Sequence, residues 1–415
     1  MADNVLTLKV LSPLVLHRRR SSAQFAPTLD YVPGSTVRGA FADLYLQGDR
    51  SRAEEPLFRD LFLSGAVRFS DFLPSRGASG VLTRLLPATA VACKRFAEHS
   101  ASSLADSLLR LELVNDLESD DTADALPLAQ AVADLHSWLT CPECELRPSS
   151  HQRDRCEPGY YASPETHEAI VVRRRMVAST AIRRTTQTVA HGLLFSHEVV
   201  EESGLLSDDV LFRGVVDAPT ELLESLQELA PRGQELALGH GRSRGFGYTE
   251  VQSWSTARVE RSTLRERWDA LNENARELWS RHKRSPAGSY FSLTLSSHLA
   301  LRDATCQPVL GDVTAADLGL PSAAERRRCV LTSLPVPGWN AALGMPKADI
   351  WALGRGSVLL FRLPPHLDPG PTLERLQEIE TVGVGERRAE GFGRVAVCDP
   401  FHYTFVQREA PETSS

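Results

Sequence analysis

The feature that most constrains this chain is an internal repeat of a glycine-rich segment. Residues 239–251 read GHGRSRGFGYTEV, and residues 383–397 read GVGERRAEGFGRVAV. Both contain a Gly-x-Gly, a few residues that include arginine, a Gly-Phe-Gly and then a strand-like segment ending in valine. Self-similarity of this kind indicates duplication of one structural unit. Because the copies lie about 145 residues apart, too far for a solenoid repeat, they predict two similar domains.

The length of 415 residues also favours two domains, because one compact core rarely grows that large. Hydrophobic residues make up 42% and charged residues 24% of the chain, as in ordinary globular proteins. The sequence contains no apolar run of about 18 residues, and MADNVLTLKV lacks the pattern of a secretory signal. We therefore expect a cytoplasmic protein with no membrane partner.

Apolar periodicity predicts the main elements. Strand-like patterns occur at residues 5–16, 66–73, 170–200, 290–302 and 356–363. Residues 31–46 form a Pro-Gly-Ser turn that leads into a helix, with Ser35 or Thr36 as N-cap. A second helical stripe consists of Leu264, Trp268, Leu271, Ala275 and Leu278.

These elements predict a first domain over residues 1–255, a linking helix over 256–285 and a second domain over 286–415. The pattern degrades between about 75 and 170, where the chain has several prolines, an acidic loop and a Cys-x-x-Cys. We interpret this stretch as an insertion into the first domain.

The net charge of −7 argues against a nucleic-acid-binding protein, but the charge is unevenly distributed. Five arginines and no acid occur between residues 169 and 197: Arg173, Arg174, Arg175, Arg183 and Arg184. A second basic run comprises residues 17–20. A local positive field can bind a polyanion whatever the overall charge, although a charge run is also compatible with a plain solvated face.

The repeated glycines favour anion binding. They are Gly239, Gly241, Gly245 and Gly247 in the first copy, and Gly383, Gly385, Gly391 and Gly393 in the second. Glycine permits positive φ, and successive backbone amides in such turns bind anions. The arginines in the two copies are Arg242, Arg244, Arg387 and Arg388. The alternative is a simple hairpin turn; a dinucleotide fingerprint is excluded because a strand, and no helix, follows each loop.

With these motifs the chain resembles the RAMP superfamily of CRISPR proteins, whose hallmark is a glycine-rich loop near the end of a ferredoxin-like unit. Residues 31–39, YVPGSTVRG, resemble that superfamily's Pro-Gly-Ser-x-x-Arg/Lys-Gly motif at the head of the first helix. Residues 183–199, which include HGLLF, are similar to its thumb-and-strand segment. Two loops, this length and a cysteine-bearing insertion look most like the double-RAMP subunit of subtype III-D effectors.

The resemblance implies an α+β fold of two ferredoxin-like, RRM-like β-α-β-β-α-β units. It also implies a non-catalytic RNA-binding subunit of a type III effector that grips the 5′ repeat-derived tag of CRISPR RNA. The implied partners are other RAMP backbone subunits, the large signature subunit and, indirectly, target RNA. By match to the motif, Arg38 and its helix N-terminus bind phosphate. The glycine loops, with His240 and their arginines, then join the Arg173–Arg184 segment in one basic surface.

Zinc is the expected cofactor, in a structural role. Cys141 and Cys144 form a Cys-x-x-Cys pair, and Cys156 follows 12 residues later. Zinc takes four thiolate or imidazole ligands, and a two-residue gap lets two thiolates reach one ion. Cys93 is the preferred fourth ligand, with His136 and His151 as alternatives. The competing interpretation is a buried or reactive dithiol, and the remaining cysteines, Cys306, Cys329 and Cys398, are expected in the core.

Two catalytic alternatives remain. Asp30 precedes the first helix, where some RAMP backbone subunits carry an aspartate that cleaves target RNA; it can equally orient the adjacent turn. His17 follows the first predicted strand, where processing RAMPs carry a histidine general base for metal-independent endoribonuclease activity. A solvated or phosphate-contacting histidine is the alternative there. The doubled glycine loop favours the non-catalytic function.

Overall fold

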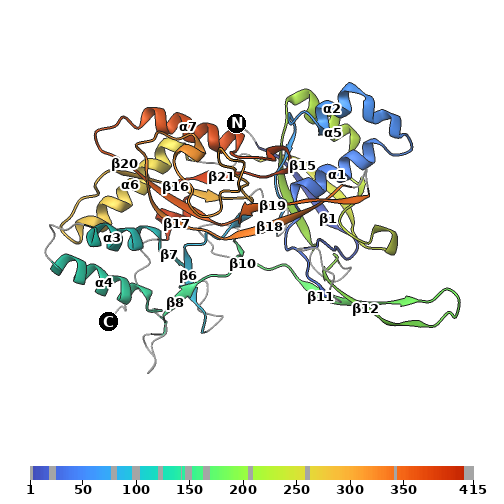
Figure 1. Ribbon diagram of the computed structural model, residues 1–415, viewed down its shortest axis with the longest axis horizontal. Helices are drawn as coiled ribbons and strands as arrows, with labels where there is room; N and C mark the ends of the chain where they lie inside the picture. The colour runs from blue at the N-terminus through green and yellow to red at the C-terminus, as the bar shows by residue number, and fades with distance from the viewer. Residues whose placement is uncertain are drawn as a thin grey trace.

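The computed structural model describes residues 3–17, 25–75, 82–95, 103–119, 125–141, 143–144, 152–161, 169–203, 209–257, 262–340 and 344–405. The fold is mixed α/β, and two larger sheets with their helices form the two halves seen in Figure 1. None of the described helices is long and apolar enough to cross a lipid bilayer.

The first sheet is centred on β1 (Asp3–Val10), which lies between β15 (Tyr248–Ala257) and β13 (Leu211–Asp217). β14 (Glu235–Ala237) pairs with β15, while the short strands β3 (Arg68–Phe69) and β4 (Leu73–Ser75) pair with β13. The helices α1 (Gly34–Tyr45), α2 (Pro56–Phe62) and α5 (Thr220–Leu229) contact one another beside it. One apolar core joins Leu6 and Leu8 of β1 to Phe41 of α1 and Leu226 of α5.

Local structure differs from the sequence-based expectation at three places in this half. The strand expected over residues 5–16 ends at Val10, and the chain then runs irregularly to His17. The helix begins at Gly34 after Pro33, so neither Ser35 nor Thr36 is its N-cap. The strand expected over residues 66–73 is divided into β3 and β4, which pair with β13 in the same direction and are separated by the irregular residues 70–72. This irregular segment directs a carboxylate at the start of α1, as described below.

The second sheet has the order β17 (Glu325–Val330), β20 (Val358–Leu363), β16 (Ser289–Leu295), β21 (Val395–Val397). The expected helical stripe is confirmed in α6 (Leu264–Ser280), because all five of its apolar residues are buried. A capping box between Thr263 and Glu266 starts this helix, and Trp268 stacks on Phe291 of β16 with ring centroids 5.5 Å apart. α7 (Gly370–Val382) contacts β21, and the short α8 (Phe401–Thr404) contacts α6.

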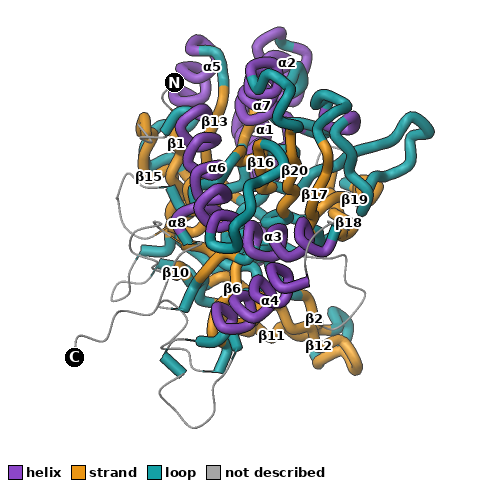
Figure 2. The backbone as a smooth tube through the Cα atoms, turned by 90° about the vertical axis from the view of Figure 1, so that its left-hand side faces the viewer, coloured by secondary structure: helices purple, strands orange, loops and turns teal. Residues whose placement is uncertain are grey.

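The segment expected to be an insertion in the first domain packs mainly on the second. Its helices are α3 (Leu108–Glu118) and α4 (Ala125–Leu139), and Leu109 and Leu113 of α3 belong to the same apolar core as α6 and β20. Buried Glu112 accepts from Arg327 of β17 at 2.6 Å. Figure 2 shows α6, α3 and α4 following one another along one side of the molecule.

Two small sheets complete this segment. β6 (Ala90–Cys93) lies between β7 (Ala105–Asp106) and β8 (Arg153–Arg155). β9 (Tyr160–Tyr161) lies between β5 (Arg84–Leu85) and β10 (Ala169–Ile170). Short 3₁₀ helices occur elsewhere, at η1 (Arg50–Glu54) and η4 (Ala316–Leu318).

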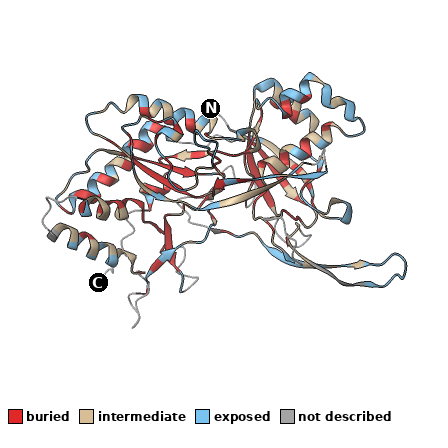
Figure 3. Cartoon of the chain, viewed as in Figure 1, coloured by how far each residue is buried: buried red, intermediate tan, exposed pale blue. Residues whose placement is uncertain are grey.

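Two long hairpins leave the sheets. β11 (Arg174–Ile182) and β12 (Val189–Val200) project far from the first half, and β2 (Phe25–Ala26) pairs with β12 near its base (Figure 1). Figure 3 shows that β11 is largely exposed, in contrast to the buried strands of both sheets. β18 (Ser333–Asn340) and β19 (Met345–Leu353) form the second hairpin, which carries the exposed Trp339 and Trp351.

Candidate functional sites around the glycine loops

The two glycine loops follow the same backbone path. In the first, Leu238 N donates to Gly247 O at 2.8 Å; in the second, Val384 N donates to Gly393 O at 3.0 Å. Each loop also contains a 3₁₀ turn, η3 (Arg242–Arg244) or η5 (Arg388–Glu390), between left-handed residues. The loops therefore repeat in structure as they do in sequence.

Each loop also hydrogen-bonds to the segment that follows the central strand of its own sheet. Gly247 N and Gly393 N donate to Pro13 O and His298 O, at 2.9 and 2.8 Å. Two further amides make the second matching pair: His240 N to Val15 O and Glu386 N to Ala300 O, both at 2.9 Å. Because of these contacts each loop is tied to the end of its own sheet.

The hydrogen bonds correct the alignment of the repeat. They pair His240 with Glu386, so Gly239 matches Gly385 and Gly241 matches Arg387. By sequence, Gly239 and Gly241 had been matched to Gly383 and Gly385. Arg387 adopts a left-handed φ of 56° where the first copy has glycine, which hides the true register.

Glycine is required where the loop closes. A Cβ on Gly247 would lie 2.0 Å from Leu238 O, and one on Gly393 would lie 1.8 Å from Val384 O. Both residues also have positive φ, at 81° and 75°. The Gly-Phe-Gly repeat is therefore explained first by close backbone approach.

The first loop is open to solvent. Arg244 and His240 are exposed, and a Cβ on Gly245 would meet no atom within 4 Å. Arg242 makes an ion pair with Asp43 of α1 at 2.8 Å. Among the ion pairs of the described residues none involves Arg244, so its guanidinium is available to an external anion.

The second loop is docked on the first half of the molecule. A Cβ on Gly391 would lie 2.7 Å from Phe69 O of β3. Glu390 pairs with Arg38 of α1 at 3.7 Å and with Lys347 of β19 at 3.1 Å. Arg38, expected to bind phosphate, is only 22% exposed and faces this carboxylate.

The arginines of the second loop remain accessible. Arg388 is exposed and Arg387 is half-buried. Their glutamate neighbours pair elsewhere: Glu386 with Arg302, and Glu390 as described above. Over the described part of the chain, Arg387 and Arg388 take part in no ion pair.

A carboxylate of the protein occupies the N-terminus of α1. Gly34 N donates to Asp71 Oδ1 at 3.2 Å, and Asp71 lies in the irregular segment between β3 and β4. Burial raises the pKa of Asp71 to about 6, against the opposing effects of Arg355 and of the Gly34 hydrogen bond. The helix start expected to bind RNA phosphate is thus filled from within.

Asp30 belongs to the same buried network between the two halves. Tyr160 donates to its Oδ1 at 2.8 Å, and Arg355 Nη2 lies 3.7 Å away. The Arg355 guanidinium also lies over the ring of Tyr31, 3.4 Å from its centroid, and 3.8 Å from Asp71. These contacts give Asp30 a structural role that needs no catalysis.

The arginines of the projecting hairpin face solvent, as do those just before it. Arg174 and Arg175 pair with Glu198 and Glu202, at 3.7 and 2.8 Å. The three that have no ion pair with a described residue are Arg173, Arg183 and Arg184, all of them exposed. They extend the positive surface outward from the first half of the molecule.

Three histidines meet beside the first loop. The ring centroids of His17 and His240 are 4.6 Å apart, and His197 of β12 lies 5.9 and 6.1 Å from them. Burial, then His240 and His197, lowers the pKa of His17 to about 4. Burial is also the main cause that lowers the pKa of His240. Sequence reasoning missed His197, because nothing local distinguishes it from other strand residues.

Three of the four cysteines that were expected to bind zinc lie close together. The sulfurs of Cys93, Cys141 and Cys144 all lie within 4.8 Å of one another, and all three residues are buried. The Cys93 and Cys144 sulfurs are 3.8 Å apart. Burial, reinforced by the two neighbouring thiols, raises the pKa of Cys144 to about 12. In the described residues this is the one group of metal-ligating atoms so closely spaced.

Cys156 is outside this cluster, contrary to expectation. Its amide donates to Ala90 O at 2.8 Å, and its side chain packs in a separate apolar cluster that includes Tyr161. Of the alternative ligands, His136 is exposed on α4 and His151 lies outside the described residues. Of the three cysteines expected in the core, Cys398 is buried, whereas Cys306 and Cys329 are exposed.

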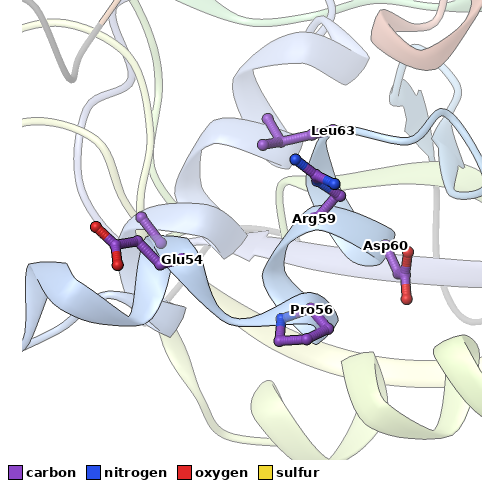
Figure 4. Close-up of a pocket in the computed structure, with 6 residues that line it drawn as sticks. Glu54, Pro56, Arg59, Asp60 and Leu63 are labelled. Atoms are coloured by element: carbon purple, nitrogen blue, oxygen red, sulfur yellow. The ribbon is translucent and has the colours of Figure 1, made fainter.

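A shallow hollow of about 460 Å³ lies on η1 and α2 (Figure 4). Its lining consists of Ala53, Glu54, Pro56, Arg59, Asp60 and Leu63. None of the residues singled out from the sequence lines it, and its charges are of both signs.

Comparison with known proteins identifies the family. The RAMP superfamily model matches residues 7–250. No curated protein matches the chain. A chain of a type III-B Cmr-beta complex bound to cognate target RNA is similar at 12% identity and a TM-score of 0.42, with 86% of each chain covered. A chain of a Csm3–Csm4 subcomplex of a type III-A CRISPR-Cas interference complex matches at 12% identity and a TM-score of 0.34, over 88% of this chain and 94% of that one.

These TM-scores are low, so the assignment comes from the sequence match, which spans more than half of the chain and includes the first glycine loop. The protein belongs to the RAMP superfamily.

Proposed function

We propose that the protein is a non-catalytic RNA-binding subunit of a type III CRISPR effector, of subtype III-D. In that role it holds the 5′ repeat-derived tag of CRISPR RNA and contacts neighbouring RAMP backbone subunits and the large signature subunit. The protein contacts target RNA only indirectly, through the CRISPR RNA. The observation that carries the proposal is a set of exposed arginines that have no ion pair with a described residue, on the first glycine loop and at the projecting hairpin.

The proposal includes a fold of two ferredoxin-like units. In the first sheet the long strands lie in the order β15-β1-β13, with β3 and β4 beyond β13; in the second the order is β21-β16-β20-β17. Both orders correspond to strands 4-1-3-2 of a β-α-β-β-α-β unit. The second unit lacks a described α-helix between β16 and β17, and α6 and α3 pack on its core.

The RNA-binding surface that we propose contains fewer residues than the surface predicted from the sequence. Arg244, Arg183 and Arg184 are exposed and make no ion pair within the part of the chain that the structure describes, so phosphates can reach them directly. Arg38 and the start of α1 instead hold the second loop and Asp71. We therefore place the RNA along the first loop and the β11–β12 hairpin.

The test compares matched charge changes in the purified chain. Binding of single-stranded RNA with the repeat tag is measured by fluorescence anisotropy at several salt concentrations. Replacing Arg183 and Arg184 by alanine should weaken binding and reduce the slope of log affinity against log salt by roughly 0.7 per lost contact. The control Arg265→Ala/Arg281→Ala removes the same charge at α6 and its C-cap, where Arg265 pairs with Asp269 and Arg281 with Glu277.

Equal effects of the two double variants would overturn the proposed surface, because binding would then follow overall charge alone. A scrambled tag tests the RNA sequence: equal affinity for both RNAs would contradict tag recognition. Recovery of the chain from cells, with identification of bound RNA and proteins, tests assembly. Recovery without CRISPR RNA or other RAMP subunits would refute the proposed complex.

A second candidate function is metal-independent endoribonuclease activity, favoured by the three histidines beside the first loop. A pKa of about 4 makes His17 a weak general base at neutral pH, which is why we rank this function second. Incubation of the protein with repeat RNA in the presence of a chelator decides between the two. A discrete cut that disappears in His17→Ala would establish the enzyme and displace the first proposal.

We also propose structural zinc at Cys93, Cys141 and Cys144, with the fourth ligand still to be assigned. Three buried thiols in contact, without a disulfide, suit a tetrahedral zinc site. Such an ion would link β6 to the chain after α4. Elemental analysis should find about one zinc per chain more in the wild type than in Cys141→Ser/Cys144→Ser, and no loss of zinc in the exposed-site control Cys329→Ser. Equal zinc in all three proteins would exclude the site.

A further inference from the structure

The histidine cluster joins three separate parts of the chain. His17 follows the irregular segment after β1, His197 lies in β12 at the base of the projecting hairpin, and His240 belongs to the first glycine loop. Their rings face one another at centroid separations of 4.6, 5.9 and 6.1 Å.

Two ring nitrogens in this cluster have no partner. Nε2 of His17 and Nδ1 of His197 are buried and make no hydrogen bond within the described residues. A buried polar atom without a partner is unfavourable, and most such atoms in proteins are satisfied. These two nitrogens are therefore candidate ligand atoms.

The internal repeat shows that the fold does not require imidazoles here. The backbone hydrogen bonds match His240 to Glu386 and Val15 to Ala300, so Arg302 occupies the place of His17. In the second copy these positions form an ordinary surface ion pair, with Arg302 Nε 3.1 Å from Glu386. His17 and His240 of the first copy are therefore not needed to hold the loop in place.

We propose that His17, His197 and His240 bind a divalent transition-metal ion such as Ni²⁺ or Zn²⁺. Around a tetrahedral ion with metal–nitrogen bonds of about 2.0–2.1 Å, three imidazole centres lie about 5 Å apart, close to the spacing here. The nitrogens are less converged than the cysteine sulfurs, so the rings must turn to bind. The bound ion would connect the base of the β11–β12 hairpin to the first glycine loop.

Nickel binding to the purified chain, prepared without a polyhistidine tag, tests the site. Titration calorimetry uses the Cys141→Ser/Cys144→Ser background, which removes the cysteine cluster as a competitor. We expect one Ni²⁺ per chain, with affinity about tenfold or more weaker in His17→Gln, His197→Gln or His240→Gln, because each removes one of three ligands. The control is His366→Gln, an exposed histidine in a loop elsewhere.

No Ni²⁺ binding in the Cys141→Ser/Cys144→Ser background, or equal Ni²⁺ affinity in the three histidine variants and the control, would overturn the proposal. If the double cysteine variant aggregates, Co²⁺ is added to the wild-type chain instead. Thiolate ligands give Co²⁺ an intense near-ultraviolet charge-transfer band, whereas an imidazole site shows only weaker visible bands. Because a thiolate site also gives visible Co²⁺ bands, the readout is the number of Co²⁺ ions bound per chain. His17→Gln/His240→Gln should bind one Co²⁺ fewer than the wild type, and an equal number would count against the site.

Discussion

The two glycine loops share one backbone and differ in what they face. The first presents Arg244 and His240 to solvent, whereas the second places Glu390 against Arg38 and Lys347. In the corrected register Arg244 and Glu390 are equivalent positions. The loop that is open to solvent therefore has a positive residue where the loop in contact with the other half has a negative one.

The comparison also shows which features of a duplicated loop are structural. Gly247 and Gly393 meet a carbonyl oxygen of their own loop, so any copy of the turn needs them. Gly245 and Gly391 have similar φ, 84° and 94°, but only Gly391 meets a neighbour, Phe69 O. Identical residues thus have different functions in the two copies.

The largest expected effect is a difference in the free energy of unfolding between alanine variants of Gly391 and Gly245. Gly391→Ala combines left-handed strain with a clash at 2.7 Å, and should lower the free energy of unfolding by about 3 kcal/mol. Gly245→Ala should lower it by only about 1 kcal/mol, from the strain alone. Urea unfolding of both variants measures the difference, and equal losses would mean that the second loop is not docked.

The next effect concerns the carboxylate that fills the start of α1. The folded-state pKa of Asp71, about 6, exceeds its ordinary value of 3.8, so the folded chain binds this proton more tightly. Stability from this group is therefore greatest at low pH and falls as pH rises from about 4 to about 6, by about 2–3 kcal/mol in total. Asp71→Asn, which keeps an acceptor for Gly34 N, should remove that fall.

Unfolding by urea at several pH values measures this effect. Asp43→Asn is the control, because the Asp43 carboxylate is 66% exposed and pairs with an arginine of the open loop. If Asp71→Asn and the wild type lose stability in parallel between pH 4 and 6, another group is responsible.

A smaller effect distinguishes the loops in RNA binding. Arg244→Ala should weaken RNA binding by about 1 kcal/mol and flatten the salt slope by roughly 0.7, because one phosphate contact is lost. Arg242→Ala should do less, since Arg242 already pairs with Asp43. Arg388→Ala in the docked loop is the matched comparison. A larger loss in Arg388→Ala than in Arg244→Ala would reverse the assignment of the loops.

The smallest expected effect is that of Asp30→Ala on catalysis. RNA cleavage by an assembled complex should be unchanged in this variant. Asp30 accepts from Tyr160 and lies near Arg355 in the junction between the halves, so its loss should lower stability by about 1 kcal/mol. Gel analysis of the cleavage products provides the readout. Disappearance of one product from an otherwise intact ladder would make Asp30 catalytic.

Some features of this protein were determined by the sequence alone, because they depend on local rules. The stripe of α6 follows from the helical period, and the paired Gly-Phe-Gly turns follow from positive φ and close backbone approach. The RAMP resemblance, carried by the first loop and by residues 31–39, agrees with the family match.

Only the tertiary structure decided which distant groups meet. Asp71 at the start of α1, His197 beside His17 and α3 against the second sheet all depend on packing between segments far apart in sequence. The same holds for the cysteines. Cys93 lies beside Cys141 and Cys144, whereas Cys156, which follows β8, packs in another cluster. Residue spacing limits which side chains can reach one another, but the packed core selects which of them do.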